Sequence, residues 1–169
     1  MTDKSKKIFL FGTIIGSFVI YSVIYYAGVF KNAPYKFTEF KSIVFKYGPG
    51  DSLVNSYNSL TGECDYINKR DSLVKTHLNL TTNDLLYLHR KAADLGFWDF
   101  PEKELNSDTT QFRKGKPTHY YIEFNYKHKS KKVLFDESFN GDVRLRDANA
   151  QLIKEITHVL ADAEDRQRK

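Results

Sequence analysis

The chain has 169 residues, a net charge of +5 and one cysteine, Cys64. A single cysteine excludes an intramolecular disulfide and a cysteine-rich zinc site, and so small a net charge does not indicate a nucleic-acid partner. Aromatic residues make up 15% of the chain. That content is enough for the core of one folded domain and is not typical of a disordered protein.

The N-terminal part of the sequence carries a long apolar run, because residues 8–30 contain no charged side chain. A helix over this run is roughly 35 Å long, which is enough to cross a hydrocarbon core of about 30 Å. The run is longer than the apolar region of a cleaved signal peptide and lacks a small-x-small cleavage site. It therefore predicts an uncleaved single-pass transmembrane helix, preceded by a cytoplasmic tail over 1–7 and followed by a tether over 31–39.

Charged and small residues around this run predict its orientation and one contact. Three lysines precede it: Lys4, Lys6 and Lys7. Because basic residues favour the cytoplasmic side, we expect the N-terminus in the cytoplasm and the domain outside it, at the envelope surface. Gly12 and Gly16 form a small-xxx-small pair that would let two helices approach closely, so a homodimer through this helix is a further prediction.

The next part of the sequence has the pattern of an antiparallel strand meander. Apolar and polar residues alternate with a period of two, and turn residues interrupt them at intervals of about 8 to 12 residues. The alternating stretches cover residues 40–47, 53–60, 63–68 and 73–80. Cys64 lies between Glu63 and Asp65, whose charges disfavour a thiolate. We therefore interpret it as a half-buried strand residue and not as a nucleophile.

A helical period then begins. Thr81 and Asp84 have the spacing of a capping box, and apolar residues follow at helical intervals until Gly96, which is typical of the position after a helix end. We interpret the aromatic cluster over 97–100 as part of the core. Residues 101–118 are polar and have no clear period, which is typical of either a functional or a disordered loop.

A hairpin and a helix complete the pattern. The hairpin covers 119–136 with its turn at 127–131, and an amphipathic helix over 144–165 follows it, with a basic tail over 166–169. The expected order is β-β-β-α-β-β-α. This predicts a single α+β domain over 40–165, in which an antiparallel sheet of about five strands packs against two helices.

The arrangement of these elements resembles that of a group of small bacterial proteins. The stretches that carry the resemblance are Leu80–Leu88, Gly96–Pro101 and Tyr120–Asp136. In pattern they are similar to uncharacterised small membrane-anchored envelope domains of bacteria. Such domains have no established activity, so the resemblance implies an architecture and no function.

Charged residues in the long polar stretch and in the hairpin offer two candidate sites. A hydrolase site built from 101–118 would use Glu102, Glu104 and Asp108, because acid and base catalysis needs paired carboxyl groups on the walls of one cleft. In loops such carboxylates are more often simply solvated. The hairpin turn would attract an anionic surface through four lysines, although a solvated turn is the simpler interpretation. These lysines are Lys127, Lys129, Lys131 and Lys132.

One segment has the spacing of an EF-hand calcium loop. Oxygen-bearing side chains lie at its first, third and fifth positions, a glycine at the sixth and an acidic residue at the twelfth. The candidate ligands are Asp136, Ser138, Asn140, Asp142 and Asp147. Against calcium, Arg144 and Arg146 place positive charge beside the cation, and Asp142 has the alternative role of capping the last helix. Calcium is the one cofactor that the sequence suggests.

The sequence contains no nucleophile elbow, no paired zinc histidines and no glycine-rich phosphate loop. We therefore expect a membrane-anchored module that binds or scaffolds an unidentified protein or envelope partner, with no nucleic-acid partner. The alternative is a hydrolase-type enzyme that uses the carboxylates of 101–118.

Overall fold

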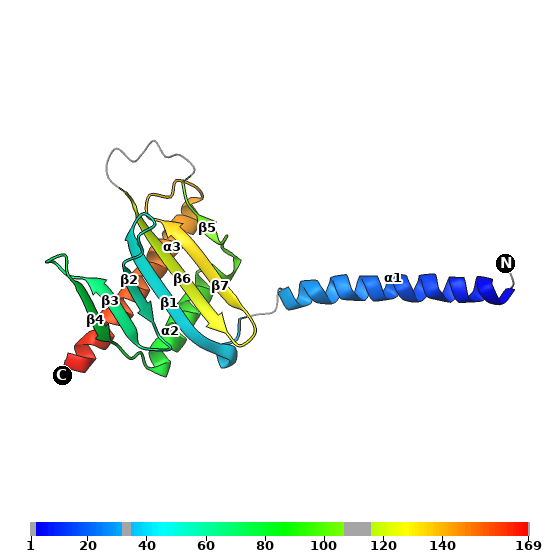
Figure 1. Cartoon of the computed structure of the whole chain (residues 1–169), viewed down its shortest axis with the longest axis horizontal. Coiled ribbons are helices and arrows are strands. Elements are labelled where there is room, and N and C mark those ends of the chain that lie inside the picture. The colour runs from blue at the N-terminus through cyan, green and yellow to red at the C-terminus, as the bar shows by residue number, and fades with distance from the viewer. Residues whose placement is uncertain (1–2, 32–34, 107–115, 169) are drawn as a thin grey trace. The chain divides into compact units, whose positions relative to one another are not determined.

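The computed structural model of the chain describes residues 3–31, 35–106 and 116–168. The chain divides into two compact units, one over Met1–Pro34 and the other over Tyr35–Lys169. The first unit is a helix, and the second holds the sheet and the remaining helices (Figure 1).

Helix α1 spans Asp3–Lys31. The hydroxyls of Thr13 and Ser17 donate to backbone carbonyls of the preceding turn at 2.8 to 3.0 Å, so the helix satisfies these polar side chains itself. Its apolar side chains are exposed, with Phe18 at 69% and Ile24 at 68%. A Cβ added at Gly12 or Gly16 would meet no atom within 4 Å. This face is therefore open to a second helix, and the homodimer stays a prediction.

The predicted membrane span over 8–30 is contradicted. Within the described part of the chain, no helix is both long and apolar enough to cross a membrane. The prediction of a single-pass protein with a cytoplasmic N-terminus and an extracytoplasmic domain rested on that span, and it is corrected with it.

The second unit contains one sheet of seven strands in the order β4-β3-β2-β1-β6-β7-β5 (Figure 1). The strands are β1 (Phe40–Pro49), β2 (Asn55–Asn58), β3 (Glu63–Ile67), β4 (Leu73–His77), β5 (Lys103–Glu104), β6 (Thr118–Tyr126) and β7 (Ser130–Asp136). Neighbouring strands are antiparallel except β5, which pairs in parallel with β7.

The predicted antiparallel sheet of about five strands is therefore corrected to a mixed sheet of seven. The four alternating stretches of the meander each form a strand of their own. Strand β5, which lies at one edge of the sheet, is only two residues long. This is too short for its sequence to show a period of two.

Two helices cover one face of this sheet (Figure 1). Helix α2 spans Thr82–Asp94 and begins with the predicted capping box, in which Thr81 and Asp84 satisfy each other's backbone N–H groups. Gly96, at φ 76°, occupies the left-handed conformation expected after the helix end. Helix α3 spans Val143–Arg168, and Asp142 accepts a hydrogen bond from the Arg144 N–H at 2.8 Å, as predicted for its cap. Two short 3₁₀ turns, η1 (Phe37–Glu39) and η2 (Phe97–Asp99), complete the unit.

The core lies between the sheet and these helices. The strand register places Phe45 of β1 opposite both Tyr57 of β2 and Ile122 of β6, so the three side chains share the covered face. Leu152 and Ile156 of α3 pack against that face and are at most 1% exposed. The predicted aromatic cluster belongs to this core, which also includes Ile43, Leu88, Ala92, Phe97, Phe100, Phe124, Val133, Phe135, Val159 and Ala163.

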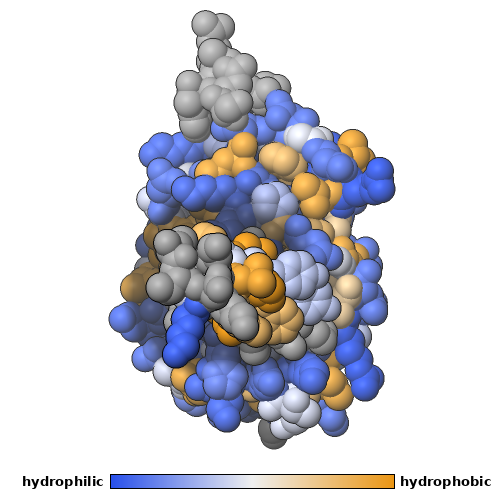
Figure 2. Space-filling model, turned by 90° about the vertical axis from the view of Figure 1, so that its right-hand side faces the viewer, coloured by the Kyte–Doolittle hydropathy of each residue, from blue (hydrophilic) through white to orange (hydrophobic). Residues whose placement is uncertain are grey.

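Figure 2 shows hydrophilic and apolar residues side by side on the surface, with hydrophilic residues predominating in this view. The sheet itself is wider than its helix layer, because neither β3 nor β4 contains a fully buried side chain. The inner faces of these outer strands are thus left partly open beside α3, and this opening positions the candidate site.

Candidate ligand-binding groove

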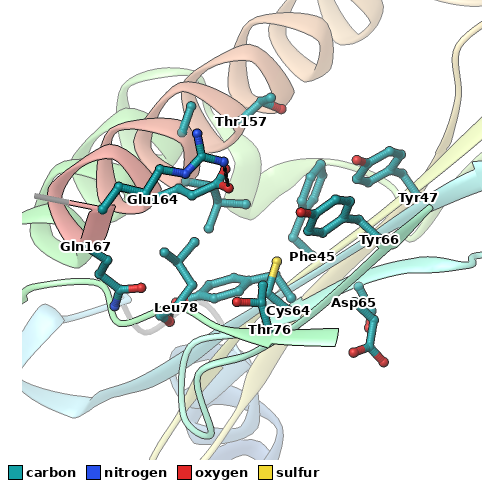
Figure 3. A pocket seen from close by; sticks show the side chains of 15 residues that line it. Phe45, Tyr47, Cys64, Asp65, Tyr66, Thr76, Leu78, Thr157, Glu164 and Gln167 are labelled. Atoms are coloured by element: carbon teal, nitrogen blue, oxygen red, sulfur yellow. Dashed lines mark hydrogen bonds and ion pairs between the residues drawn. The ribbon is translucent and has the colours of Figure 1, made fainter. Parts of the chain in front are cut away.

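A groove with a volume of about 410 Å³ lies between the C-terminal half of α3 and the inner face of strands β1 to β4 (Figure 3). Three buried side chains form its floor: Phe45, Tyr57 and Leu78, each at most 4% exposed. The Tyr57 hydroxyl donates to the Leu78 carbonyl at 3.2 Å, and burial raises the pKa of Tyr57 to about 12. The one polar group of the floor is therefore already bonded, and the floor is apolar.

Hydrogen-bonding groups from the strands form one wall of the groove. Cys64 is the cross-strand neighbour of both Tyr57 and Thr76, so its side chain lies on the inner face beside them. Tyr66 is two residues further along β3 and shares this face. In Figure 3 the side chains of Cys64 and Tyr66 point into the groove, whereas the carboxylate of Asp65 points away from α3.

The thiol in this wall is kept protonated. Cys64 is half-buried, and its pKa is raised first by burial and then by the carboxylates of Glu164 and Asp65. Because a thiolate is the reactive form, this environment makes Cys64 a weak nucleophile. The structure confirms the prediction of a half-buried strand residue.

Helix α3 supplies the opposite wall. Thr157, Leu160, Ala161 and Glu164 lie three and four residues apart and so fall on one side of the helix. The Arg168 guanidinium reaches back to the Glu164 carboxylate at 2.5 Å. This pair neutralises the charge of the wall (Figure 3).

The last turn of α3 is fastened to the connection between β4 and α2. The Gln167 amide, with its nitrogen placed toward the strand, donates to the His77 carbonyl and accepts from the Asn79 N–H, both at 3.0 Å. Arg166 donates to the Asp84 carboxylate at 2.6 Å. Of these residues, Gln167 lines the groove. Arg166 and Gln167, predicted as part of a basic tail, belong to helix α3 and form these contacts.

The structure describes two of the three predicted hydrolase carboxylates. Glu102 is exposed, whereas Glu104 is 1% exposed and accepts a hydrogen bond from the Asn149 amide at 2.7 Å. Asp108 lies outside the described residues. The two described carboxylates therefore occupy different environments, and the hydrolase alternative stays a prediction.

The oxygens of the predicted calcium loop are engaged in local turns. Asp136 accepts from both the N–H and the hydroxyl of Ser138 at 2.7 Å, and Asn140 donates its N–H to Asn106 at 2.9 Å. Asp142 caps α3, and Asp147 lies exposed within that helix beside Arg146, at 3.4 Å. Among the described residues, no group of three or more His, Cys, Asp or Glu side chains is arranged to hold a metal ion. Calcium binding stays a prediction.

Two of the four lysines of the predicted basic surface contact other residues of the fold, and two are exposed. Lys129 lies over the ring of Tyr35, 4.0 Å from its centroid, and Lys131 donates to the carbonyl of Phe100. Lys127 and Lys132 are exposed. Half of the expected charge cluster is thus engaged within the fold, and binding of an anionic surface by the remainder stays a prediction.

Sequence reasoning did not identify the groove. Tyr47, Tyr66 and Thr76 line it from three strands, and Glu164 and Arg168 line it from a helix about 90 residues away. The available signal was the alternation that places Cys64 and Tyr66 on one strand face. The helix positions could not be paired with that face without the strand order.

Comparison with known proteins gives no match, whether by family model, by curated protein sequence or by solved structure. The functional inference therefore rests on the geometry of the chain itself.

Proposed function

We propose that the domain is a binding module and that its ligand site is the groove between α3 and strands β1 to β4. One observation carries this proposal: an apolar floor and hydrogen-bonding walls converge on a single concave space of about 410 Å³. Small-molecule sites typically have volumes of about 300 to 1,000 Å³, mostly apolar linings and a few placed polar groups.

The lining indicates a small uncharged ligand with a flat apolar part. Phe45, Tyr47 and Tyr66 offer aromatic rings against which such a part packs. The Thr76 hydroxyl lies on one wall for hydroxyl or amide groups of the ligand, and on the facing wall Thr157 Oγ1, which donates to the Ile153 carbonyl at 2.8 Å, is left to accept a hydrogen bond. Arg168 already pairs with Glu164, and the remaining charged residue of the lining is Asp65, so we expect a ligand without negative charge.

The chemistry of the groove supports binding over catalysis. The Cys64 thiol is protonated, and the Glu164 carboxylate is held by an arginine. General acid–base catalysis uses a group whose pKa lies near the working pH and which reaches the reacting atom. Cys64 instead supplies a hydrogen-bond donor, and Glu164 supplies one half of an ion pair with Arg168.

A fluorescence titration tests the proposal with N-phenyl-1-naphthylamine, an uncharged flat aromatic probe, added to the full chain. We expect saturable one-site binding with a dissociation constant on the order of micromolar, as for a fragment of this size in a preformed apolar pocket. The variant Ala161→Trp fills the groove from an exposed helix position and should weaken binding at least about tenfold, or roughly 1.4 kcal/mol.

The matched control is Ala150→Trp, an exposed alanine of the same helix that does not line the groove. It should bind the probe as the wild type does. Equal affinity in all three proteins, or no saturable binding to the wild type, would contradict a ligand site in this groove.

A further inference from the structure

Two buried polar side chains meet where β5 packs against α3, away from the groove. Glu104 of β5 is 1% exposed and Asn149 of α3 is 0% exposed. The Asn149 amide nitrogen donates to Glu104 Oε2 at 2.7 Å and to the Leu145 carbonyl at 2.9 Å. Both hydrogens of that amide are therefore in use.

Each side chain also buries one oxygen without a hydrogen-bond partner among the described residues: Glu104 Oε1 and Asn149 Oδ1. A buried polar atom left unpaired costs about 1 to 3 kcal/mol, more if it is charged. The amide oxygen can only accept, and an ionised carboxylate can only accept. One added proton satisfies both atoms, because a carboxylic acid donates through its O–H.

We propose that Glu104 is carried as a neutral carboxylic acid whose Oε1–H donates to Asn149 Oδ1, and that this proton latches β5 to α3. The acid and the amide then form a ring of two hydrogen bonds, with Asn149 Nδ2 donating to Oε2 and Oε1 donating back. The proton is taken from solvent as the domain folds, and it returns to solvent when the latch opens.

The charged groups around the latch permit this protonation. From β7, the ammonium of Lys131 favours the ionised carboxylate, but burial outweighs it and raises the pKa of Glu104 to about 7. Burial likewise lowers the pKa of Lys131, against the carboxylates of Glu102, Asp99 and Glu104, which raise it. The contact from α3 is the neutral amide of Asn149.

The sign of the pH dependence of stability follows from the raised pKa of Glu104. In the unfolded chain the carboxyl ionises near its ordinary pKa of 4.5, and in the folded domain near 7. Between these values the folded state binds the extra proton, so stability falls as the pH rises through this window, and the loss is complete above pH 7. Among the described residues, β5 has two register pairs with β7, Lys103 with Leu134 and Glu104 with Phe135, so ionisation should release this short strand first.

A carbon-13 NMR titration of the full chain, labelled at the glutamate carboxyl carbon, tests the latch directly. Glu104→Gln identifies the resonance, because it removes only that signal. We expect the Glu104 carboxyl to titrate near pH 7, together with faster amide exchange in β5 above that pH. A Glu104 resonance that titrates near its ordinary pKa in the wild-type chain would overturn the proposal.

Urea unfolding at pH 5 and pH 8 gives an independent readout. The side-chain amide of Glu104→Gln donates to Asn149 Oδ1 at every pH and so mimics the closed latch. We expect the folding equilibrium constant of the wild type to fall at least about tenfold more than that of the variant between the two pH values. Equal losses in the two proteins would also overturn the proposal.

Discussion

Glu164 sets the charge and the thiol chemistry of the groove. Its carboxylate binds Arg168 at 2.5 Å, and after burial it is the largest cause of the raised pKa of Cys64. A single side chain thus balances the charge of Arg168 and disfavours the thiolate of Cys64. Glu164 and Arg168 lie one turn apart on the exposed side of α3, so this role depends on the two side chains themselves.

The variant Glu164→Gln should lower the pKa of Cys64. The negative charge is lost and Arg168 is freed, and both changes favour the thiolate. We expect iodoacetamide to alkylate Cys64 roughly twofold faster at the same pH, as for a partly screened charge near the surface. Asp65→Asn is the matched control and should have a smaller effect, since Asp65 is the smaller cause and points away from α3. An unchanged rate in Glu164→Gln would refute this role.

At the scale of the elements, helix starts were the most predictable features. The capping box of α2 and the Asp142 cap of α3 follow from local sequence, because each is made within three residues along the chain. Strand β5 could not be predicted, because it depends on pairing with β7 and not on its own two residues. The groove could not be predicted either, because its two walls, α3 and β3, are brought together by strand pairings between residues far apart in the sequence.

The α2 cap yields an element-scale prediction. Thr81 accepts from the Asp84 N–H at 3.2 Å and donates its own N–H to that carboxylate at 2.8 Å. Thr81→Ala should destabilise the fold by about 1 kcal/mol and lower the melting temperature by about 3 °C. The control Thr82→Ala, at the exposed first position of the helix, should stay within about 0.5 kcal/mol of the wild type. The melting temperatures are measured by the fluorescence of Trp98. Equal melting temperatures for the two variants would contradict the role of the cap.

At the scale of the whole molecule, the groove follows from a mismatch between two layers. Within the described residues of the second unit, the sheet has seven strands and its inner face is covered by the two helices α2 and α3. The central strands contain buried side chains under this layer, whereas β3 is largely half-buried and β4 largely exposed. We propose that a ligand completes the burial of this inner face.

The most direct measurement of this claim is protection of the single thiol by the bound probe. Cys64 is the one cysteine of the chain, and its side chain points into the groove. We expect saturating N-phenyl-1-naphthylamine to slow its alkylation by iodoacetamide about tenfold or more in the wild type and in Ala150→Trp, in proportion to occupancy. An alkylation rate that saturating probe leaves unchanged would place the ligand elsewhere and contradict the account.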